Sequence, residues 1–283
     1  MVDEPGGWPP TPRALILTVY GLYARERDGW LPVAGLIRLM AAAGVGESAV
    51  RSSIARLKRR GVLVSRRVEG AAGYALSADA LAMLSEGDRR IFGRPKARYE
   101  EDGWVLAIFS VPESDRARRH ELRSHLSRLG FGAVSPGVWI APGALAAETA
   151  DMLGRSSLDQ YVQLFTGEPV DLAELPRKLA DWWDLPRIRH AYTAYLRRWR
   201  PVLDRWQAES GDTAAAFADY VHTVTDWRRL PYLDPGLPVA LLPADWEADD
   251  AADLFVALHH RLAAPSHEFA THASSSPDRR SLT

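Results

Sequence analysis

The sequence predicts a multidomain α+β protein. Its 283 residues are 47% hydrophobic and 25% charged, an ordinary globular composition that supports two or three modest cores. Along the chain the pattern changes from helices and a hairpin, through alternating strands and helices, to helices alone. Residues 1–98 hold 16 Lys and Arg against 9 Asp and Glu, whereas residues 99–283 hold 19 against 27. A basic front on an acidic body is typical of a nucleic-acid reader joined to sensing and assembly domains, with chance clustering as the alternative.

Composition also bounds the compartment and the chemistry. No apolar run approaches the roughly 20 residues that cross a bilayer, and residues 1–12 lack the pattern of a signal peptide. The chain has no cysteine, which excludes disulfides, thiolate zinc sites and a cysteine nucleophile. We therefore expect a cytoplasmic protein that spans no membrane, with no cofactor, no metal and no catalytic residue.

The first predicted domain covers residues 13–98, after a flexible start at residues 1–12. A helical stripe runs from Ala14 to Arg25. A second helix, with Pro32 in its first turn, ends at the sharp Gly44-Val45-Gly46 reversal. The third helix, Glu47 to Arg60, has Val50, Ile54 and Leu57 on the face that packs inward. This order predicts a helix-turn-helix.

The opposite face of the third helix is polar and basic. Arg is suited to bidentate contact with guanine, and Ser and Lys are suited to phosphates and mixed base contacts. We expect Arg56 and Ser52 to contact the bases. The alternative for any single arginine is an exposed side chain that contacts only solvent. Ala55 lies on the same outward face. The helix residues that we expect at DNA are Ser48, Arg51, Ser52, Arg56, Lys58 and Arg59.

A hairpin follows the third helix. The stretches Val62 to Val68 and Gly73 to Leu76 have the composition of strands, and the Gly70-Ala-Ala segment is the expected turn. A hairpin after a helix-turn-helix predicts a wing. Arg66 and Arg67 are expected there as contacts to the DNA backbone.

The middle domain, residues 99–169, is expected to be a ferredoxin-like α+β fold. A helix capped by Ser77 leads through Met83 and Ile91 to a linker at Gly93-Arg-Pro-Lys96. Strands and helices then alternate in the order of that fold. The expected elements are Trp104–Val111, Ser114–Leu129, Val134–Ala141 with a break at Pro136-Gly137, Ala144–Leu153 and Tyr161–Phe165.

Residues 170–263 are predicted to be all helical, for ligand sensing and dimerisation. Helices are expected at 172–183, 187–207, 213–230 and 251–261, and the proline-studded segment at 227–246 cannot be one regular element. Residues 264–283 lack apolar periodicity and are predicted to be a disordered tail.

Aromatic and basic side chains gather where this helical domain begins. Rings offer stacking surfaces and arginines offer cations for an aromatic acyl-CoA with its phosphates. A place in the core is the favoured alternative for Trp182, Trp183 and Trp199, and Arg187 and Arg189 could instead pair with nearby acids. The candidate ligand-binding residues are Trp182, Trp183, Arg187, His190, Tyr192, Tyr195 and Arg197, beside Arg189.

Three segments resemble the PaaX family of regulators. They are Pro12-Arg-Ala-Leu-Ile-Leu17, Trp104-Val-Leu-Ala-Ile-Phe-Ser-Val-Pro112 and the block from Leu233 to Trp246, and the resemblance runs from Pro12 to Leu262. It implies a homodimeric repressor of a phenylacetate-type catabolic operon, released from double-stranded operator DNA by phenylacetyl-CoA or a related inducer. It leaves open the inducer, the operator, and the choice between repressor and activator.

The middle domain also resembles the small nuclease fold of the CRISPR spacer-acquisition machinery. That fold needs an acidic metal ligand at the end of its first strand, where this chain has Ser110. Two alternatives stay open: a metal-dependent nuclease relying on Glu113 or Asp115, and an acyl-CoA-acting enzyme that uses the winged helix for binding. The His259-His260 pair points to two helix faces and suits no single metal. A triad of Ser110, His120 and Asp115 lacks a nucleophile elbow.

Overall fold

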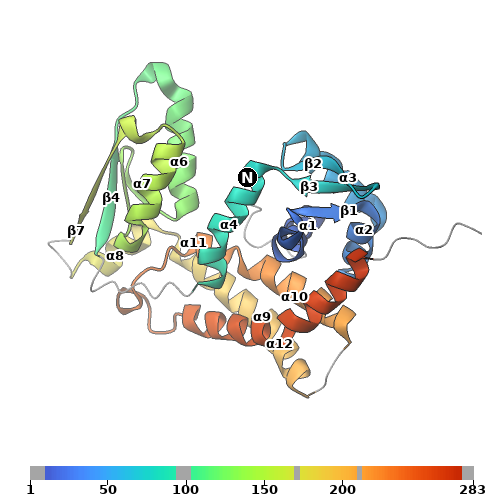
Figure 1. Cartoon of the computed structure of the whole chain (residues 1–283). Coiled ribbons are helices and arrows are strands. Elements are labelled where there is room, and N and C mark those ends of the chain that lie inside the picture. Colours follow the sequence, from blue (N-terminus) through green and yellow to red (C-terminus); the bar gives the residue numbers. More distant parts are fainter. Residues whose placement is uncertain (1–9, 94–102, 169–172, 209–211, 276–283) are drawn as a thin grey trace, which may run out of the picture. The chain divides into compact units, whose positions relative to one another are not determined.

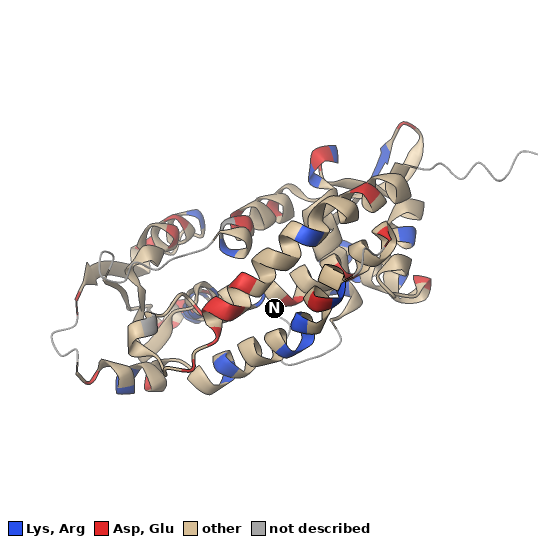
Figure 2. Cartoon of the chain, turned by 90° about the horizontal axis from the view of Figure 1, so that it is seen from below, with Lys and Arg blue, Asp and Glu red and all other residues tan. Residues whose placement is uncertain are grey.

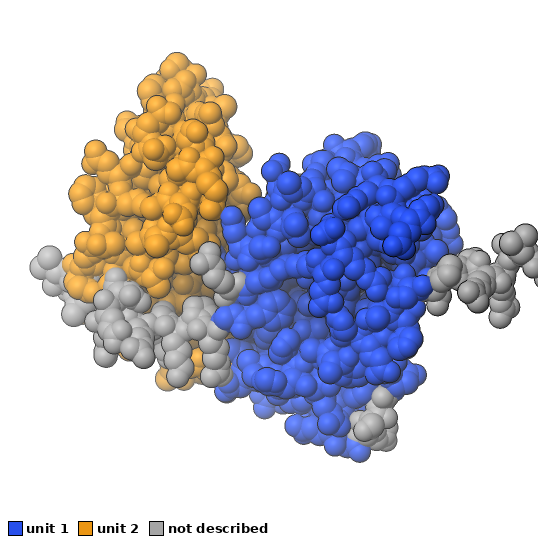
Figure 3. Space-filling model, viewed as in Figure 1, with its two compact units in different colours: residues 1–93, 194–228, 250–283 blue, residues 94–193, 229–249 orange. Residues whose placement is uncertain are grey.

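The computed structural model describes residues 10–93, 103–168, 173–208 and 212–275. The chain forms two compact units (Figure 3). Unit 1 combines residues 1–93, 194–228 and 250–283, and unit 2 combines residues 94–193 and 229–249. The described part has two antiparallel sheets and a mostly helical C-terminal region (Figure 1), which confirms a multidomain α+β protein. None of its helices is long and apolar enough to cross a bilayer.

The front of unit 1 has three helices followed by a hairpin and a fourth helix. Helix α1 begins where the Thr11 side chain accepts a hydrogen bond from the Ala14 amide at 3.3 Å and Pro12 takes the first helical position. Thr11 and Pro12, which fall in the predicted flexible start at residues 1–12, therefore form the cap and the first residue of α1. The elements in order are α1 (Pro12–Tyr23), β1 (Trp30–Pro32), α2 (Val33–Ala42), α3 (Glu47–Arg59), β2 (Leu63–Val68), β3 (Ala71–Leu76) and α4 (Ala78–Phe92).

The three strands form one sheet in the order β1-β3-β2. Pro32 belongs to β1 and precedes α2, so its predicted place in the first turn of that helix is wrong by one residue. Val68 pairs with Ala71, which leaves Glu69 and Gly70 as a two-residue turn with φ of 50° and 81°. The predicted Gly70-Ala-Ala turn is thus one residue late, because the tight hairpin requires positive φ at both turn positions and takes Ala71 and Ala72 into β3.

Two helices from the end of the sequence complete the core of unit 1. They are α10 (Thr213–Trp227) and α12 (Ala248–Ser275). The Thr225 hydroxyl of α10 donates to the Thr18 hydroxyl of α1 at 2.7 Å, and both side chains are buried. The Phe269 ring of α12 lies 5.2 Å from the Phe217 ring of α10. The front helices therefore share one compact unit with α10 and α12.

The end of α12 contacts α1 and α2. Ser266 is fully buried and its hydroxyl shares a hydrogen bond with that of Tyr23. The Arg38 guanidinium donates to the Ala273 carbonyl at 2.8 Å. The predicted disordered tail is wrong for residues 264–275, because small buried side chains at Ser266, Ala270 and Ser274 seat the helix without strong apolar periodicity. Residues 276–283 lie outside the described residues.

Unit 2 is built on a four-stranded antiparallel sheet in the order β5-β6-β4-β7. Val105 and Ala107 of β4 are buried in one core with Leu122 and Leu126 of α6. The turn at Pro136-Gly137 separates β5 from β6, as predicted. The elements are β4 (Trp104–Phe109), α6 (Arg116–Leu129), β5 (Gly132–Ser135), β6 (Val138–Pro142), α7 (Ala146–Arg155) and β7 (Val162–Gly167).

Unit 2 also holds the helix α8 (Leu175–Trp182) and the short helix α11 (Leu230–Leu233). A Cβ on Gly132 of β5 would lie 2.9 Å from Trp182 and Trp183, so the tryptophan pair packs directly on the sheet. The irregular structure after Leu233 agrees with the prediction for the proline-studded segment. The 24-residue helix α9 (Leu185–Ala208) contributes its first residues to unit 2 and the rest, from Ala194, to unit 1.

The units therefore divide the chain differently from the three predicted domains. The predicted helical domain at residues 170–263 is shared between the units, because α10 and α12 pack with the front helices and residues 173–193 pack with the sheet. Residues 94–96 of the predicted linker lie outside the described residues, as do residues 1–9.

Candidate nucleic-acid interface

Helix α3 is held in unit 1 by one buried face. Val50, Ile54 and Leu57 are at most 4% exposed, as the helical spacing predicts, and Ser53 is buried beside them. Gly44, at φ +77°, provides the reversal between α2 and α3. The Nε2 of His222 on α10 lies 3.0 Å from the Ala43 carbonyl, so α10 supports this turn directly. Burial lowers the pKa of His222, which favours the neutral ring at this contact.

The other face of α3 is open to solvent. Arg56 donates from Nη2 to the Ser52 hydroxyl at 3.3 Å, which lays its guanidinium along the helix surface. Arg51 pairs with Glu47 one turn earlier, with 2.7 Å between Nε and Oε1. No carboxylate in the described part of the chain forms an ion pair with Arg56. The exposed residues on this helix are Ser48, Arg51, Ser52, Ala55, Arg56, Lys58 and Arg59.

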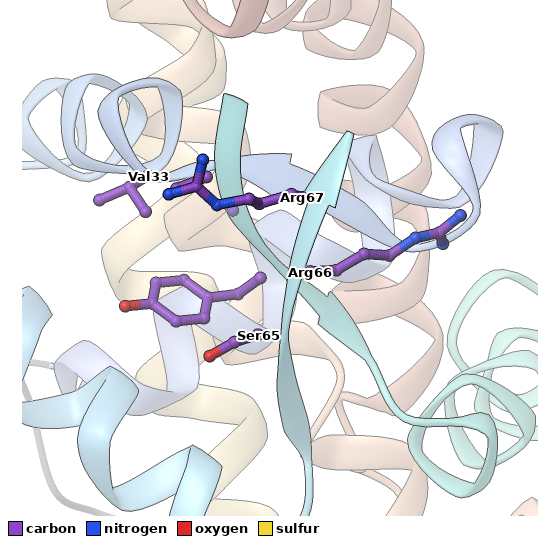
Figure 4. Close-up of a pocket in the computed structure, with 7 residues that line it drawn as sticks. Val33, Ser65, Arg66 and Arg67 are labelled. Atoms are coloured by element: carbon purple, nitrogen blue, oxygen red, sulfur yellow. The ribbon is translucent and has the colours of Figure 1, made fainter. Parts of the chain in front are cut away.

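The hairpin places its two arginines on opposite faces. Neighbouring side chains in a strand alternate, and Arg66 and Arg67 of β2 point in opposite directions (Figure 4). The Arg66 guanidinium lies 3.9 Å from an Asp28 carboxylate oxygen. Arg67 instead points toward Val33 at the start of α2 (Figure 4).

A hollow with a cavity volume of about 200 Å³ lies against the hairpin. The ammonium of Lys58, from the last turn of α3, stands 5.5 Å from the centre of the Tyr74 ring that lines this hollow. The hollow therefore adjoins α3. The residues that line it are Val33, Ser65, Arg66, Arg67, Ala72, Gly73 and Tyr74.

Of these lining residues, only Arg66 and Arg67 were predicted from the sequence as contacts to DNA. Ser65 and Tyr74 were not predicted. The period of two along a strand could have indicated them, because Ser65 and Arg67 are two residues apart and therefore share a face, and Tyr74 pairs with Ser65 on the next strand. In Figure 2 the Lys and Arg positions (blue) and the Asp and Glu positions (red) are scattered over the helices.

The predicted ligand-binding residues are divided between the two units. Trp182, Trp183, Arg187, His190 and Tyr192 belong to unit 2, and Tyr195 and Arg197 belong to unit 1.

The rings of this set are core side chains. The buried Trp183 indole donates to the Gly130 carbonyl at 2.8 Å, and its ring centre lies 6.0 Å from that of Trp104. The buried Tyr195 ring lies 5.5 Å from Trp227. Trp182 is half-buried beside Trp183. Trp183 and Tyr195 therefore belong to the interior of their units.

Tyr192 contributes to a buried polar cluster in unit 2. Its hydroxyl donates to Asp234 at 3.0 Å, and the other oxygen of that carboxylate accepts the amides of Gly236 and Leu237 at 2.9 and 3.1 Å. Burial raises the pKa of Asp234 despite these donors. This cluster fixes the Asp-Pro-Gly turn. Arg187, His190 and Arg197 are exposed, and their role at an inducer stays a prediction.

Family models match almost the whole chain in three consecutive pieces. The model described as PaaX-like protein matches residues 11–80, the PaaX protein central Cas2-like domain matches residues 98–179, and the PaaX-like protein C-terminal domain matches residues 183–272. This chain belongs to the PaaX family. The transcriptional repressor PaaX of Escherichia coli (strain K12) is 26% identical over 260 residues, which cover 90% of this chain and 81% of the relative.

A solved structure of an uncharacterised protein from Mycobacterium tuberculosis is also similar to this PaaX-family chain. It matches with a TM-score of 0.56 at 27% sequence identity, over 93% of this chain and 98% of the other. The similarity therefore extends through both units.

The acids near the end of β4 in this PaaX-family chain are engaged with neighbouring side chains. The Tyr161 hydroxyl donates to Asp115 at 3.0 Å, which raises the pKa of Tyr161. Glu113 pairs with Arg116 and Arg119, each at 3.0 Å. Among the described residues, no group of three or more His, Asp or Glu side chains is placed to hold a metal ion.

Proposed function

We propose that this chain is a sequence-specific DNA-binding transcription repressor and that α1 to α3 with the β2-β3 hairpin form a winged helix-turn-helix. The observation that carries the proposal is the exposed face of α3, where Arg56 and Ser52 stand free of carboxylates in a chain of the PaaX family. The similar protein from Escherichia coli is a transcriptional repressor. A helix of this kind enters the major groove, where bidentate arginine contacts distinguish guanine.

The eight DNA contacts that we propose combine base reading with backbone binding. Arg56 and Ser52 read bases, because they project from the centre of the exposed face of α3. The others bind phosphates and set the register of the protein on the duplex. The full set is Ser48, Arg51, Ser52, Arg56, Lys58, Arg59, Arg66 and Arg67.

The sheet of unit 2 is proposed to be a ferredoxin-like scaffold on which two copies pair. Its order of elements, strand-helix-strand-strand-helix-strand, supports that fold. Ile108 is 42% exposed and Phe165 is 52% exposed on this sheet, and large apolar side chains open to solvent support an interface. Two copies would place their α3 helices in successive major grooves of a palindromic operator.

The inducer is proposed to be phenylacetyl-CoA or another aryl-CoA, and the target an aromatic-acid catabolic operon. Support comes from the membership of this chain in the PaaX family. A ligand that binds more tightly to a dimer whose α3 helices no longer match the half-site spacing releases the operator. A ligand with equal affinity for both states releases nothing.

Fluorescence anisotropy with a labelled operator duplex tests the proposal through Arg56→Ala. The expected loss is about 1 to 3 kcal/mol, or roughly a 5- to 150-fold weaker Kd. Binding to an unrelated duplex should change far less, because only base reading is lost. Arg177→Ala is the matched control, since Arg177 is an exposed arginine on α8 that pairs with Glu174. Equal operator affinity in wild type and Arg56→Ala would remove Arg56 from the base-reading set.

Titrating the complex with phenylacetyl-CoA and other acyl-CoAs tests the inducer. One aryl-CoA should lower operator affinity in a saturable manner, while free CoA leaves it unchanged. Light scattering on the same samples should give the mass of a dimer. Operator binding that no acyl-CoA alters would contradict the proposed inducer class and leave the DNA-binding proposal standing.

A further inference from the structure

The hollow against the hairpin has the chemistry of a sugar-phosphate site. Val33 and Ala72 contribute apolar side chains to its lining, and Ser65, Arg66, Arg67 and Tyr74 contribute polar ones. Figure 4 shows Arg67 and Ser65 on the same side of the hairpin, with Val33 beside the guanidinium. Tyr74 pairs with Ser65 across the hairpin, so its side chain shares that side. A deoxyribose ring is largely apolar on its faces and carries a phosphate that attracts guanidinium and hydroxyl donors.

The cations at this hollow are available to a ligand. The Arg67 guanidinium makes only a long contact of 3.5 Å with the Gly70 carbonyl and no ion pair with any described residue. Lys58 stands over the Tyr74 ring at 5.5 Å, so a second positive charge lies at the α3 side of the hollow. A phosphate seated between them would meet two cations in a place that already adjoins the exposed face of α3.

Arg66 is in a different situation, although it borders the same hollow. Its side chain points away from the other lining residues (Figure 4). The Arg66 guanidinium lies 3.9 Å from an Asp28 carboxylate oxygen, and the Arg66 carbonyl accepts the Trp30 indole at 3.2 Å. On that face the Trp30 indole covers Gly73, where a Cβ would lie only 2.3 Å from Nε1. Arg66 is therefore directed toward an acid and an aromatic ring.

We propose that the hollow seats one deoxyribose-phosphate unit of the operator backbone, with Arg67 as its principal cation, and that Arg66 makes no contact with that DNA. This inference rests on the proposed function. It narrows that proposal by removing Arg66 from the eight proposed DNA contacts and keeping Arg67 as the phosphate contact of the hairpin. It also adds Ser65 and Tyr74 to the surface that positions the duplex and places Lys58 beside them, and none of these contacts carries base specificity.

The matched pair Arg67→Gln and Arg66→Gln tests the assignment. Both side chains are exposed, so both variants should keep the urea midpoint of the wild type. Duplex affinity is measured from 0.05 to 0.4 M salt on the operator and on an unrelated duplex of equal length. Each lost phosphate contact lowers the slope of log affinity against log salt concentration by about 0.9. With equal affinities extrapolated to 1 M salt, this change is about an eightfold loss of affinity at 0.1 M salt. We expect that loss, equal on both duplexes, for Arg67→Gln and wild-type behaviour for Arg66→Gln.

Ala72→Glu provides a second variant, because it places a carboxylate opposite Arg67 on the exposed side of the hairpin. It should reproduce the loss seen with Arg67→Gln. If Arg66→Gln loses as much as Arg67→Gln, or if neither loses affinity, the assignment of the hollow is overturned while the proposed function survives. If the wild type binds no duplex with a steep salt dependence, the proposed function itself fails.

Discussion

The final turns of α12 should stabilise the packing of α1 and α2 in unit 1. A variant that ends at Ala263 loses the hydrogen bonds from Arg38 to the Ala273 carbonyl at 2.8 Å and from Arg27 to the Ser274 hydroxyl at 2.9 Å. It also loses the Tyr23 to Ser266 hydrogen bond. Each such bond contributes about 0.5 to 1.5 kcal/mol to the free energy of unfolding.

The same truncation removes the Phe217 to Phe269 ring pair, which contributes about 0.5 to 1.5 kcal/mol beyond its buried area. Together these contacts contribute about 2 to 6 kcal/mol, which is a large share of the roughly 5 to 15 kcal/mol that stabilises an ordinary domain. With a urea m value of about 2 kcal/mol per molar, the midpoint should fall by about 1 to 3 M.

Urea unfolding followed by tryptophan fluorescence measures this midpoint, and operator binding is measured on the same samples. The control is a variant that ends at Ser275 and lacks only residues 276–283. It should match the full chain in both measurements. A chain ending at Ala263 that unfolds at the wild-type midpoint and binds operator normally would refute the role of residues 264–275 in the core of unit 1.

Two further substitutions test the packing of each unit. Gly73→Ala should lower the urea midpoint and weaken duplex binding, because its Cβ would lie 2.3 Å from Trp30 Nε1, and overpacking costs about 1 to 3 kcal/mol; an unchanged midpoint would contradict this close approach. Asp234→Asn should flatten the pH dependence of stability. The raised pKa of Asp234 means that the folded protein binds a proton more tightly than the unfolded chain, so stability falls as pH rises from the ordinary carboxyl pKa through the raised one. Urea midpoints across this range that fall equally in wild type and Asp234→Asn would assign the dependence to another group.

Local periodicity was enough to predict the surface of α3. Val50, Ile54 and Leu57 recur at helical spacing, and their burial leaves Arg56 and Ser52 outward whatever the rest of the chain does. The alternating strands and helices of unit 2 could be predicted for the same reason, because their apolar faces are visible in the local sequence.

Long-range packing was beyond the same reasoning. Ser266, Ala270 and Ser274 are buried because they are small enough for α12 to approach α1 and α2, and a Cβ on Gly35 would lie 3.0 Å from the Ser274 Cα. A hydrophobicity pattern does not indicate which small side chains allow two helices to approach closely. Trp183, for which a place in the core was the favoured alternative, is buried, and so is Tyr195. Residue type alone does not separate rings of the core from rings that bind a ligand.

The partnership between the first helix and the last has a consequence for synthesis of the protein. Tyr23 and Ser266 lie 243 residues apart, so a ribosome adding about 5 to 20 residues per second needs roughly 10 to 50 s to supply the partner of a side chain it made early. During that interval Leu15, Ile16 and Val19, which end fully or almost fully buried, wait without the helices that cover them. The nascent chain therefore keeps part of this apolar surface open until α12 has been synthesised, and a product that ends before residue 264 lacks the contacts of α12 with α1 and α2.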